Sequence, residues 1–149
     1  RFDDVVQWVA ERGLSLQRRS ENQTIKLSTQ VVLGDSMGEM FAWYAAVDVA
    51  FIGGSLKNYG CQNLIEACAV GTPVLIGPST FNFAEAAREA LACGAARQIM
   101  DADELVQQAN CLLSDAHQRQ NMGLAGREFV LRHRGATARS LALVANLLQ

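Results

Sequence analysis

Short apolar runs alternate with segments of helical spacing along most of this chain. The runs are rich in β-branched residues and are bounded by glycine or proline, which predicts strands. The strongest runs are QVVLG, DVAFIGG and PVLIG, at residues 30–34, 48–54 and 73–77, and weaker ones are LSLQRRS at 14–20 and ARQIM at 96–100. Because the strong runs are apolar without a break, we expect central parallel strands covered on both faces. These central strands should include residues 31–34, 49–52 and 73–76.

The segments between the strands have the apolar spacing of helices. They are residues 5–9 before Gly13, 38–47, 62–70 before Gly71, 82–93 before Gly94, and 102–113, which opens with the capping pair Asp101 and Glu104. A helical tail follows, with apolar residues at Met122, Ala125, Phe129, Leu141, Val144 and Leu148. Repeated βα units predict an α/β fold, a Rossmann-like, doubly wound parallel sheet with helices on both faces. The length of 149 residues suits one compact domain, residues 1–149.

Composition argues against several classes of function. The net charge of −2 gives no footprint for nucleic acid, and no apolar run is long enough to cross a bilayer. The cysteines have no CxxC spacing and both histidines lie in the helical tail, so we expect no metal site and no cofactor. Cys68 and Cys111 have apolar neighbours and are expected to be buried. The chain opens on Arg1 without an initiating methionine, so we expect a fragment of a longer protein.

Ligands of such sheets bind at the carboxyl ends of the strands, which here lead into loops 34–39, 53–63 and 77–83. In the first loop, Ser36 and Glu39 have the S-x-x-E spacing of a capping box. Alternatively, Ser36 and the backbone N–H groups of Met37, Gly38 and Glu39 receive a phosphate. The two interpretations are compatible, because backbone N–H groups would do most of the binding.

The second loop offers a further place for a ligand. Gly53 and Gly54 remove two β-carbons where a ligand or another backbone segment can approach. Asn63 and Glu66 have the N-x-x-E spacing of a helix cap, but residues three apart also share a helix face. A carboxylate there can accept two hydrogen bonds from the vicinal diol of a ribose, so both interpretations stay open. Lys57 is the only lysine near this place, and we interpret it as a solvated side chain.

The third loop is simpler to interpret. Pro78, Ser79, Thr80 and Asn82 indicate a turn and a helix N-cap. The nearby Phe81 is expected in the core or in packing between domains rather than stacked on a cofactor. No Ser/His/Asp or Cys/His pair has a credible spacing for nucleophilic catalysis. The sequence therefore predicts binding loops and no catalytic residue.

Three segments together resemble a known family. LGDSMGEMFAWYAAVDVAFIGGSL, then G-x-x-N-x-x-E-A, then GTPVLIGPSTFNF resemble the C-terminal half of the 3-deoxy-D-manno-octulosonic acid (Kdo) transferases of lipopolysaccharide biosynthesis. The resemblance covers about residues 1–100. It implies the C-terminal half of a GT-B glycosyltransferase, which holds the donor sugar nucleotide at a cleft facing a second Rossmann-like domain. The family transfers Kdo from CMP-Kdo to a lipid A precursor, without a metal, at the cytoplasmic side of the bacterial inner membrane.

Carried onto this chain, the resemblance implies a donor-binding site. Ser36, Met37, Gly38 and Glu39 would meet the CMP phosphate or the sugar, and Gly53, Gly54 and Ser55 would line the nucleotide. Asn63 and Glu66 would hold groups on the phosphate side and the ribose. The catalytic base, the acceptor surface and the membrane anchor would belong to an N-terminal half, so this domain alone is expected to be soluble and inactive.

The chain departs from the family pattern at one place. The family usually reads G-G-H-N-P-L-E where this chain has GCQNLIE, so Gln62 replaces a histidine and cannot carry a proton at neutral pH. The departure puts a charge-balancing role of that histidine in doubt. Two alternatives remain. One is a GT-B donor domain for a UDP-sugar, and the other is a non-catalytic α/β binding module, which the altered GCQNLIE segment favours.

Overall fold

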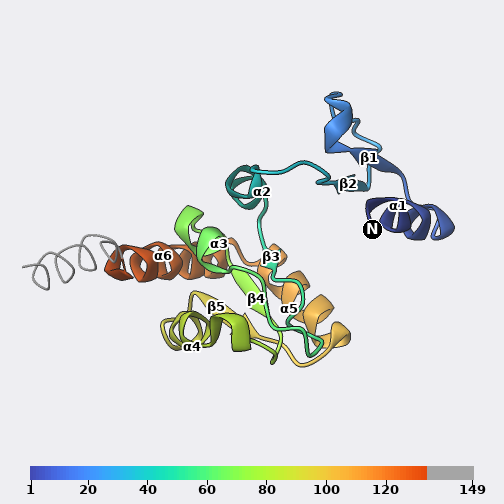
Figure 1. Ribbon diagram of the computed structural model, residues 1–149. Coiled ribbons are helices and arrows are strands. Elements are labelled where there is room, and N and C mark those ends of the chain that lie inside the picture. Colours follow the sequence, from blue (N-terminus) through green and yellow to red (C-terminus); the bar gives the residue numbers. More distant parts are fainter. Residues whose placement is uncertain (134–149) are drawn as a thin grey trace, which may run out of the picture. The chain divides into compact units, whose positions relative to one another are not determined.

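The computed structural model describes residues 1–133 and divides the chain into two compact units, Arg1–Glu39 and the part from Met40 onward. Each unit contains its own parallel sheet beside helices, so the fold is an open α/β fold, as predicted (Figure 1). The extent of a single domain over residues 1–149 stays a prediction.

The first unit is a small βα arrangement. It contains α1 (Phe2–Glu11), β1 (Leu16–Arg18), a 3₁₀ turn (Arg19–Glu21) and β2 (Val31–Leu33). The strands pair in parallel, with Leu16 opposite Val31, which confirms both strand predictions in this unit. All residues of β1 and β2 are only half-buried, so the predicted full cover on both faces is not seen at residues 31–34. A 39-residue segment has too little apolar surface to enclose a strand by itself.

The second unit is larger and carries the core. It contains α2 (Met40–Ala46), β3 (Ala50–Phe51), α3 (Ile65–Val70), β4 (Val74–Ile76), a 3₁₀ turn (Phe81–Phe83), α4 (Ala84–Ala92), β5 (Ala96–Gln98), α5 (Ala102–Ser114) and α6 (Ala116–His133). The strands lie in the order β3-β4-β5, all parallel, with β4 central (Figure 1). The predicted strands at 73–77 and 96–100 are thereby confirmed, and the run at 48–54 gives a short strand.

The central strand β4 is buried on both faces, as its unbroken apolar run predicts. Val74 and Ile76 pack into one cluster with residues of α3, α4 and α6, whereas Leu75 packs into a second cluster with residues of α5 and α6. Successive strand residues point to opposite faces, so the two clusters lie on the two faces of the sheet. Helices therefore cover both faces of β4. Neighbouring β3 is less enclosed, because Phe51 stays 38% exposed.

The helix predictions hold within residues 1–133. The capping pair is confirmed at α5, where the Glu104 N–H donates to Asp101 Oδ1 at 2.8 Å. The helical tail is confirmed as far as α6, and Met122 and Phe129 are buried as its spacing predicts. The predicted apolar positions Leu141, Val144 and Leu148 lie outside the described residues.

Two glycines of α6 allow it to approach α3 very closely. A β-carbon at Gly123 would overlap the carbonyl of Gly71, and one at Gly126 would lie 3.2 Å from the Cα of Cys68. Arg127 adds two hydrogen bonds from its guanidinium to the carbonyl of Val70, at 2.8 and 3.3 Å. The C-terminal end of α3 is thus fixed by α6, and this holds the loop that leads into α3 in place.

Candidate functional site

The predicted site residues lie in both units, and each group is described within its own unit. In the first unit, Ser36 donates a hydrogen bond to one oxygen of the Glu39 carboxylate, and Arg19 donates to the other at 2.8 Å. These bonds, that of Ser36 above all, hold the pKa of Glu39 below its ordinary value. Met37 is 94% exposed and Gly38 has φ of +82°, a left-handed conformation that a side chain disfavours.

The capping box predicted from Ser36 and Glu39 is not formed. Helix α2 begins at Met40, so both residues precede it, and the Ser36 hydroxyl bonds the carboxylate of Glu39. The left-handed backbone at Gly38 interrupts helical geometry between the two, which explains the late start. The pair therefore serves to fix the loop shape, and the hydroxyl is already engaged.

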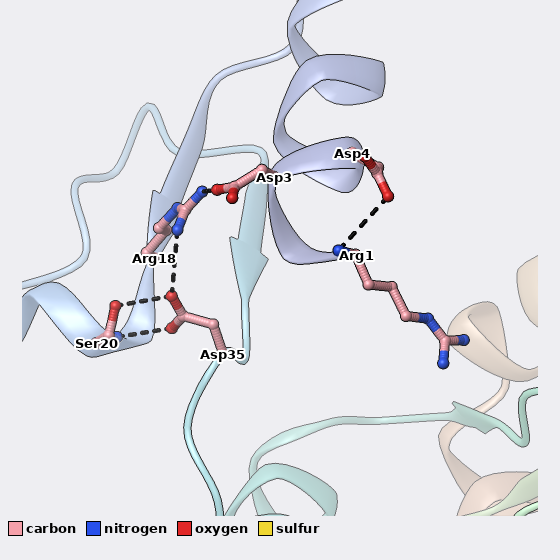
Figure 2. A network of polar contacts seen from close by, with 6 residues as sticks. All are labelled: Arg1, Asp3, Asp4, Arg18, Ser20 and Asp35. Atoms are coloured by element: carbon pink, nitrogen blue, oxygen red, sulfur yellow. Dashed lines mark hydrogen bonds and ion pairs between the residues drawn. The ribbon is translucent and has the colours of Figure 1, made fainter.

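A second network lies beside this loop, at the carboxyl end of β1 and β2 (Figure 2). Arg18 pairs with Asp3 of α1 and approaches Asp35 at 3.9 Å. Asp35 also accepts two hydrogen bonds from Ser20, from the backbone N–H at 2.9 Å and from the hydroxyl at 2.7 Å. These bonds lower the pKa of Asp35, with the Ser20 hydroxyl as the largest cause. The network ties the turn after β1 to the loop after β2, a role that the sequence did not indicate for Asp35.

The glycine pair of the second unit serves two different purposes. Gly54 has φ of +82°, and a β-carbon there would overlap the carbonyl of Gly60, so a close backbone approach requires glycine. A β-carbon at Gly53 would meet open space, and the Gly53 carbonyl accepts a hydrogen bond from the Gln62 N–H at 3.2 Å. The loop thus closes on itself, and only Gly53 leaves room in which a ligand could approach.

Ser55 is completely buried, and its hydroxyl has two partners. It donates to the carbonyl of Ile52 at 2.5 Å and accepts from the N–H of Gly77 at 2.8 Å. Its own carbonyl accepts from the N–H of Ser79 at 2.9 Å, and a β-carbon at Gly77 would overlap it. Ser55 therefore joins the loop after β3 to the loop after β4, and its side chain does not face an open surface.

The third loop is tied to the second by further polar contacts. Ser79 Oγ accepts from the N–H of Gly60 at 3.1 Å, and Asn82 donates to the carbonyl of Tyr59 at 3.4 Å. The predicted N-cap role of these side chains is wrong, because neither the 3₁₀ turn nor α4 has a side-chain cap bond at its N-terminus. Phe81 is 61% exposed, so it does not belong to the core, and packing between domains stays a prediction.

A hollow of about 540 Å³ opens between these two loops. We call it the Lys57 hollow, and it is lined by Leu56, Lys57, Asn58, Pro78, Ser79, Thr80 and Phe81. It lies just past the carboxyl ends of β3 and β4, where the topology predicts ligands. Sequence reasoning placed both loops at this edge but did not identify their shared hollow.

Asn63 and Glu66 contact each other at the start of α3. Asn63 Nδ2 donates to Glu66 Oε1 at 3.1 Å, while Asn63 Oδ1 accepts from the N–H of Ile65 at 3.0 Å. The N-x-x-E cap predicted from the spacing is not formed, because Leu64 is the N-cap of α3 and Asn63 lies one residue before it, bonded to the N–H two residues on. Both side chains are half-buried, and Glu66 keeps its second oxygen without a hydrogen bond among residues 1–133. The pair can accept hydrogen bonds from a ligand without losing its present contact.

Within residues 1–133, no group of three or more acidic, cysteine or histidine side chains could hold a metal ion. None of the helices in that range is both long and apolar enough to cross a membrane. Cys68 is buried as predicted, and burial raises its thiol pKa to about 12. The same prediction for Cys111 is wrong. That side chain is exposed on α5, since it lies about 100° around the helix from the buried Leu112.

Comparison with known proteins identifies the family. The model of the family "Glycosyl transferases group 1" matches residues 11–129, and the chain belongs to this family. Two relatives are 3-deoxy-D-manno-octulosonic acid transferases. The Bordetella pertussis transferase is 47% identical, and the match covers 95% of this chain and 33% of that protein. The Haemophilus influenzae transferase is 37% identical, and the match covers 100% of this chain and 35% of that protein. The chain thus spans about a third of the length of these relatives.

A solved structure supports the same relationship. The crystal structure of the C-terminal CMP-Kdo binding domain of WaaA from Acinetobacter baumannii superimposes with a TM-score of 0.82 at 34% identity. The match covers 87% of this chain and 68% of that one. The predicted resemblance to the Kdo transferases, and the fold that it implies, are therefore confirmed.

Proposed function

We propose that this chain is the donor-binding domain of a Kdo transferase, and that it binds CMP-Kdo. The observation that carries the proposal is the close structural match to a domain described as CMP-Kdo binding, at 34% identity over 87% of the chain. The loops at the carboxyl ends of the parallel strands give such a ligand its expected place. The full protein would transfer Kdo to a lipid A precursor at the cytoplasmic face of the inner membrane, as the similarity to the two bacterial transferases supports.

The donor contacts proposed for this chain keep the residues predicted from the sequence, and each group of residues is proposed within its own unit. They are Ser36, Met37, Gly38 and Glu39 in the first unit, and Gly53, Gly54, Ser55, Asn63 and Glu66 in the second. The geometry changes how three of them contribute. Ser36 and Ser55 have engaged hydroxyls, and Gly54 is required by a backbone approach, so these residues shape loops whose backbone groups meet the donor.

Glu66 is the proposed donor-binding residue whose role can be tested most directly. Its carboxylate would accept the ribose hydroxyls, while Asn63 holds it in place through the 3.1 Å contact. Charge-assisted hydrogen bonds to a carboxylate contribute about 1.5–3 kcal/mol. Glu66→Gln keeps the shape and removes the charge, so we expect CMP affinity to fall by about that amount.

Isothermal titration with CMP and a urea denaturation curve separate the two roles of Glu66. A residue that only supports the start of α3 would lose about 0.5–1 kcal/mol of stability on substitution and leave the affinity unchanged. The matched control is Glu85→Gln, which removes an acidic residue from the first turn of α4. Equal affinities for CMP in Glu66→Gln and Glu85→Gln would remove Glu66 from the proposed site.

The nucleotide itself separates the proposal from its alternatives. In a thermal-shift assay, CMP should raise the melting temperature and UDP should not. A larger shift with UDP would favour a donor domain for a UDP-sugar, and no shift with either would favour a non-catalytic binding module. We expect the chain alone to bind CMP with a dissociation constant nearer millimolar than micromolar. One domain of a two-domain cleft supplies only part of the contacts and leaves the ligand exposed to water. Transfer to an acceptor is not expected from this domain alone.

A further inference from the structure

The Lys57 hollow is built on a rigid frame. Both of its loops are joined by the hydroxyl and carbonyl of the buried Ser55, which accept from the N–H groups of Gly77 and Ser79. They are joined again where Gly60 N–H donates to Ser79 Oγ at 3.1 Å. These contacts between the two loops hold the lining residues in place before any ligand arrives. A preformed hollow of this kind avoids the ordering cost of binding.

The polar side chains of the hollow can all donate hydrogen bonds. The ammonium group of Lys57 is in none of the ion pairs found among residues 1–133, and the lining includes no Asp or Glu. Ser79 Oγ accepts a bond from Gly60 and donates none to another group within residues 1–133, so its own proton can point to a ligand. Thr80 adds a second hydroxyl and Asn58 an amide. A lining with one cation and several hydrogen-bond donors, and without a carboxylate, favours an anionic ligand.

The remaining walls are apolar. Leu56, Pro78 and Phe81 complete the lining, and the ring of Phe81 is 61% exposed. Large exposed aromatic side chains beside fixed polar groups are typical of ligand sites. The hollow therefore suits a negatively charged group, with apolar walls beside it for the body that carries that group.

We propose that the Lys57 hollow is an anion subsite for the donor, with Lys57, Ser79 and Thr80 binding a negatively charged group. The inference rests on the proposed function, in which the donor carries a phosphodiester and a sugar carboxylate. Either group has the chemistry that the hollow recognises. From the sequence alone we interpret Lys57 as a solvated side chain. Its position in the lining of the hollow changes this interpretation.

The test compares Lys57→Ala with Lys26→Ala, because these are the chain's two lysines and each substitution removes one positive charge. Lys26 lies in the first unit and does not line the hollow. Binding of cytidine, CMP and CMP-Kdo is measured by calorimetry at low and high salt. We expect Lys57→Ala to weaken CMP-Kdo binding about tenfold at low salt and less at high salt, and Lys26→Ala to change it less than twofold.

The three ligands distinguish the source of the anion. A loss with CMP and CMP-Kdo, but not with cytidine, assigns the subsite to the phosphate, and a loss with CMP-Kdo alone assigns it to the sugar carboxylate. Equal affinities of the two lysine variants for all three ligands would overturn the proposal. Thr80→Val provides a second, nearly isosteric test that leaves net charge unchanged, and it should weaken the same ligand as Lys57→Ala.

The subsite remains testable if the unmodified chain binds no cytidine nucleotide, an outcome that would overturn the proposed function. Millimolar inorganic phosphate is then titrated against the ¹⁵N-labelled chain while amide resonances are followed by NMR. Saturable shifts at Ser79 and Thr80 that are lost in Lys57→Ala would support an anion subsite. Shifts absent there, or unchanged by the substitution, would refute it.

Discussion

Replacing Ser55 by alanine should destabilise the second unit strongly. The side chain is fully buried, and its hydroxyl is the recorded partner of two buried backbone groups, the carbonyl of Ile52 and the N–H of Gly77. Alanine would leave both without a partner in a place with no access to water. Although its side chain is small, Ser55 should therefore contribute strongly to the stability of the two loops of the proposed donor site.

The magnitude follows from the contacts. A buried donor or acceptor left unsatisfied costs about 1–3 kcal/mol, and here there are two such groups. Removing the hydroxyl also removes the cost of taking it out of water, which offsets part of the loss. We therefore expect Ser55→Ala to lower the free energy of unfolding by about 2–3 kcal/mol.

Urea denaturation followed by circular dichroism measures this change, with comparison of transition midpoints at equal slope. Ser114→Ala is the matched control, since Ser114 is exposed and its hydroxyl bonds only backbone carbonyls of its own helix. That variant should stay within about 0.5 kcal/mol of the unmodified chain. A loss below 1 kcal/mol in Ser55→Ala, with reduced CMP affinity, would show instead that the hydroxyl serves the ligand, and the structural reasoning would be wrong.

Three further predictions concern single side chains. Asp101→Ala removes the cap of α5 and should cost about 1 kcal/mol of unfolding free energy in the same assay. Hydrogen bonds from Ser20 lower the pKa of Asp35, so its charged form stabilises the first unit above the ordinary carboxyl pKa of about 4, and this contribution is lost as pH falls through the lowered pKa. Asp35→Asn should therefore reduce stability at pH 7 and reduce it progressively less on acidification, which denaturation curves across pH measure; an equal loss at every pH would contradict this reasoning. Cys68 should resist a thiol reagent at pH 8 until the chain unfolds, while the exposed Cys111 reacts at once, as mass spectrometry of labelled peptides would reveal.

Local patterns in the sequence were enough for the order and type of the elements. An unbroken apolar run such as residues 73–77 can only be satisfied by cover on both faces, and β4 is enclosed in that way. The cap at Asp101 depends on contacts three residues away, so it too could be read directly. The N-x-x-E spacing likewise indicated that the Asn63 and Glu66 side chains meet at the start of α3, although the cap that it predicted is not formed.

Tertiary structure decided what depends on residues far apart in the chain. From the sequence we expected Ser55 to line the nucleotide, but its hydroxyl accepts a hydrogen bond from the N–H of Gly77, 22 positions later. Ser79 looked like a helix cap until Gly60 was found beside it, and the Lys57 hollow exists only because those two loops meet. Sequence spacing determines which groups face one another within a turn or a helix. Which hydrogen-bonding groups remain free for a ligand is decided by the packing of distant segments, since every buried polar group must first find its own partner.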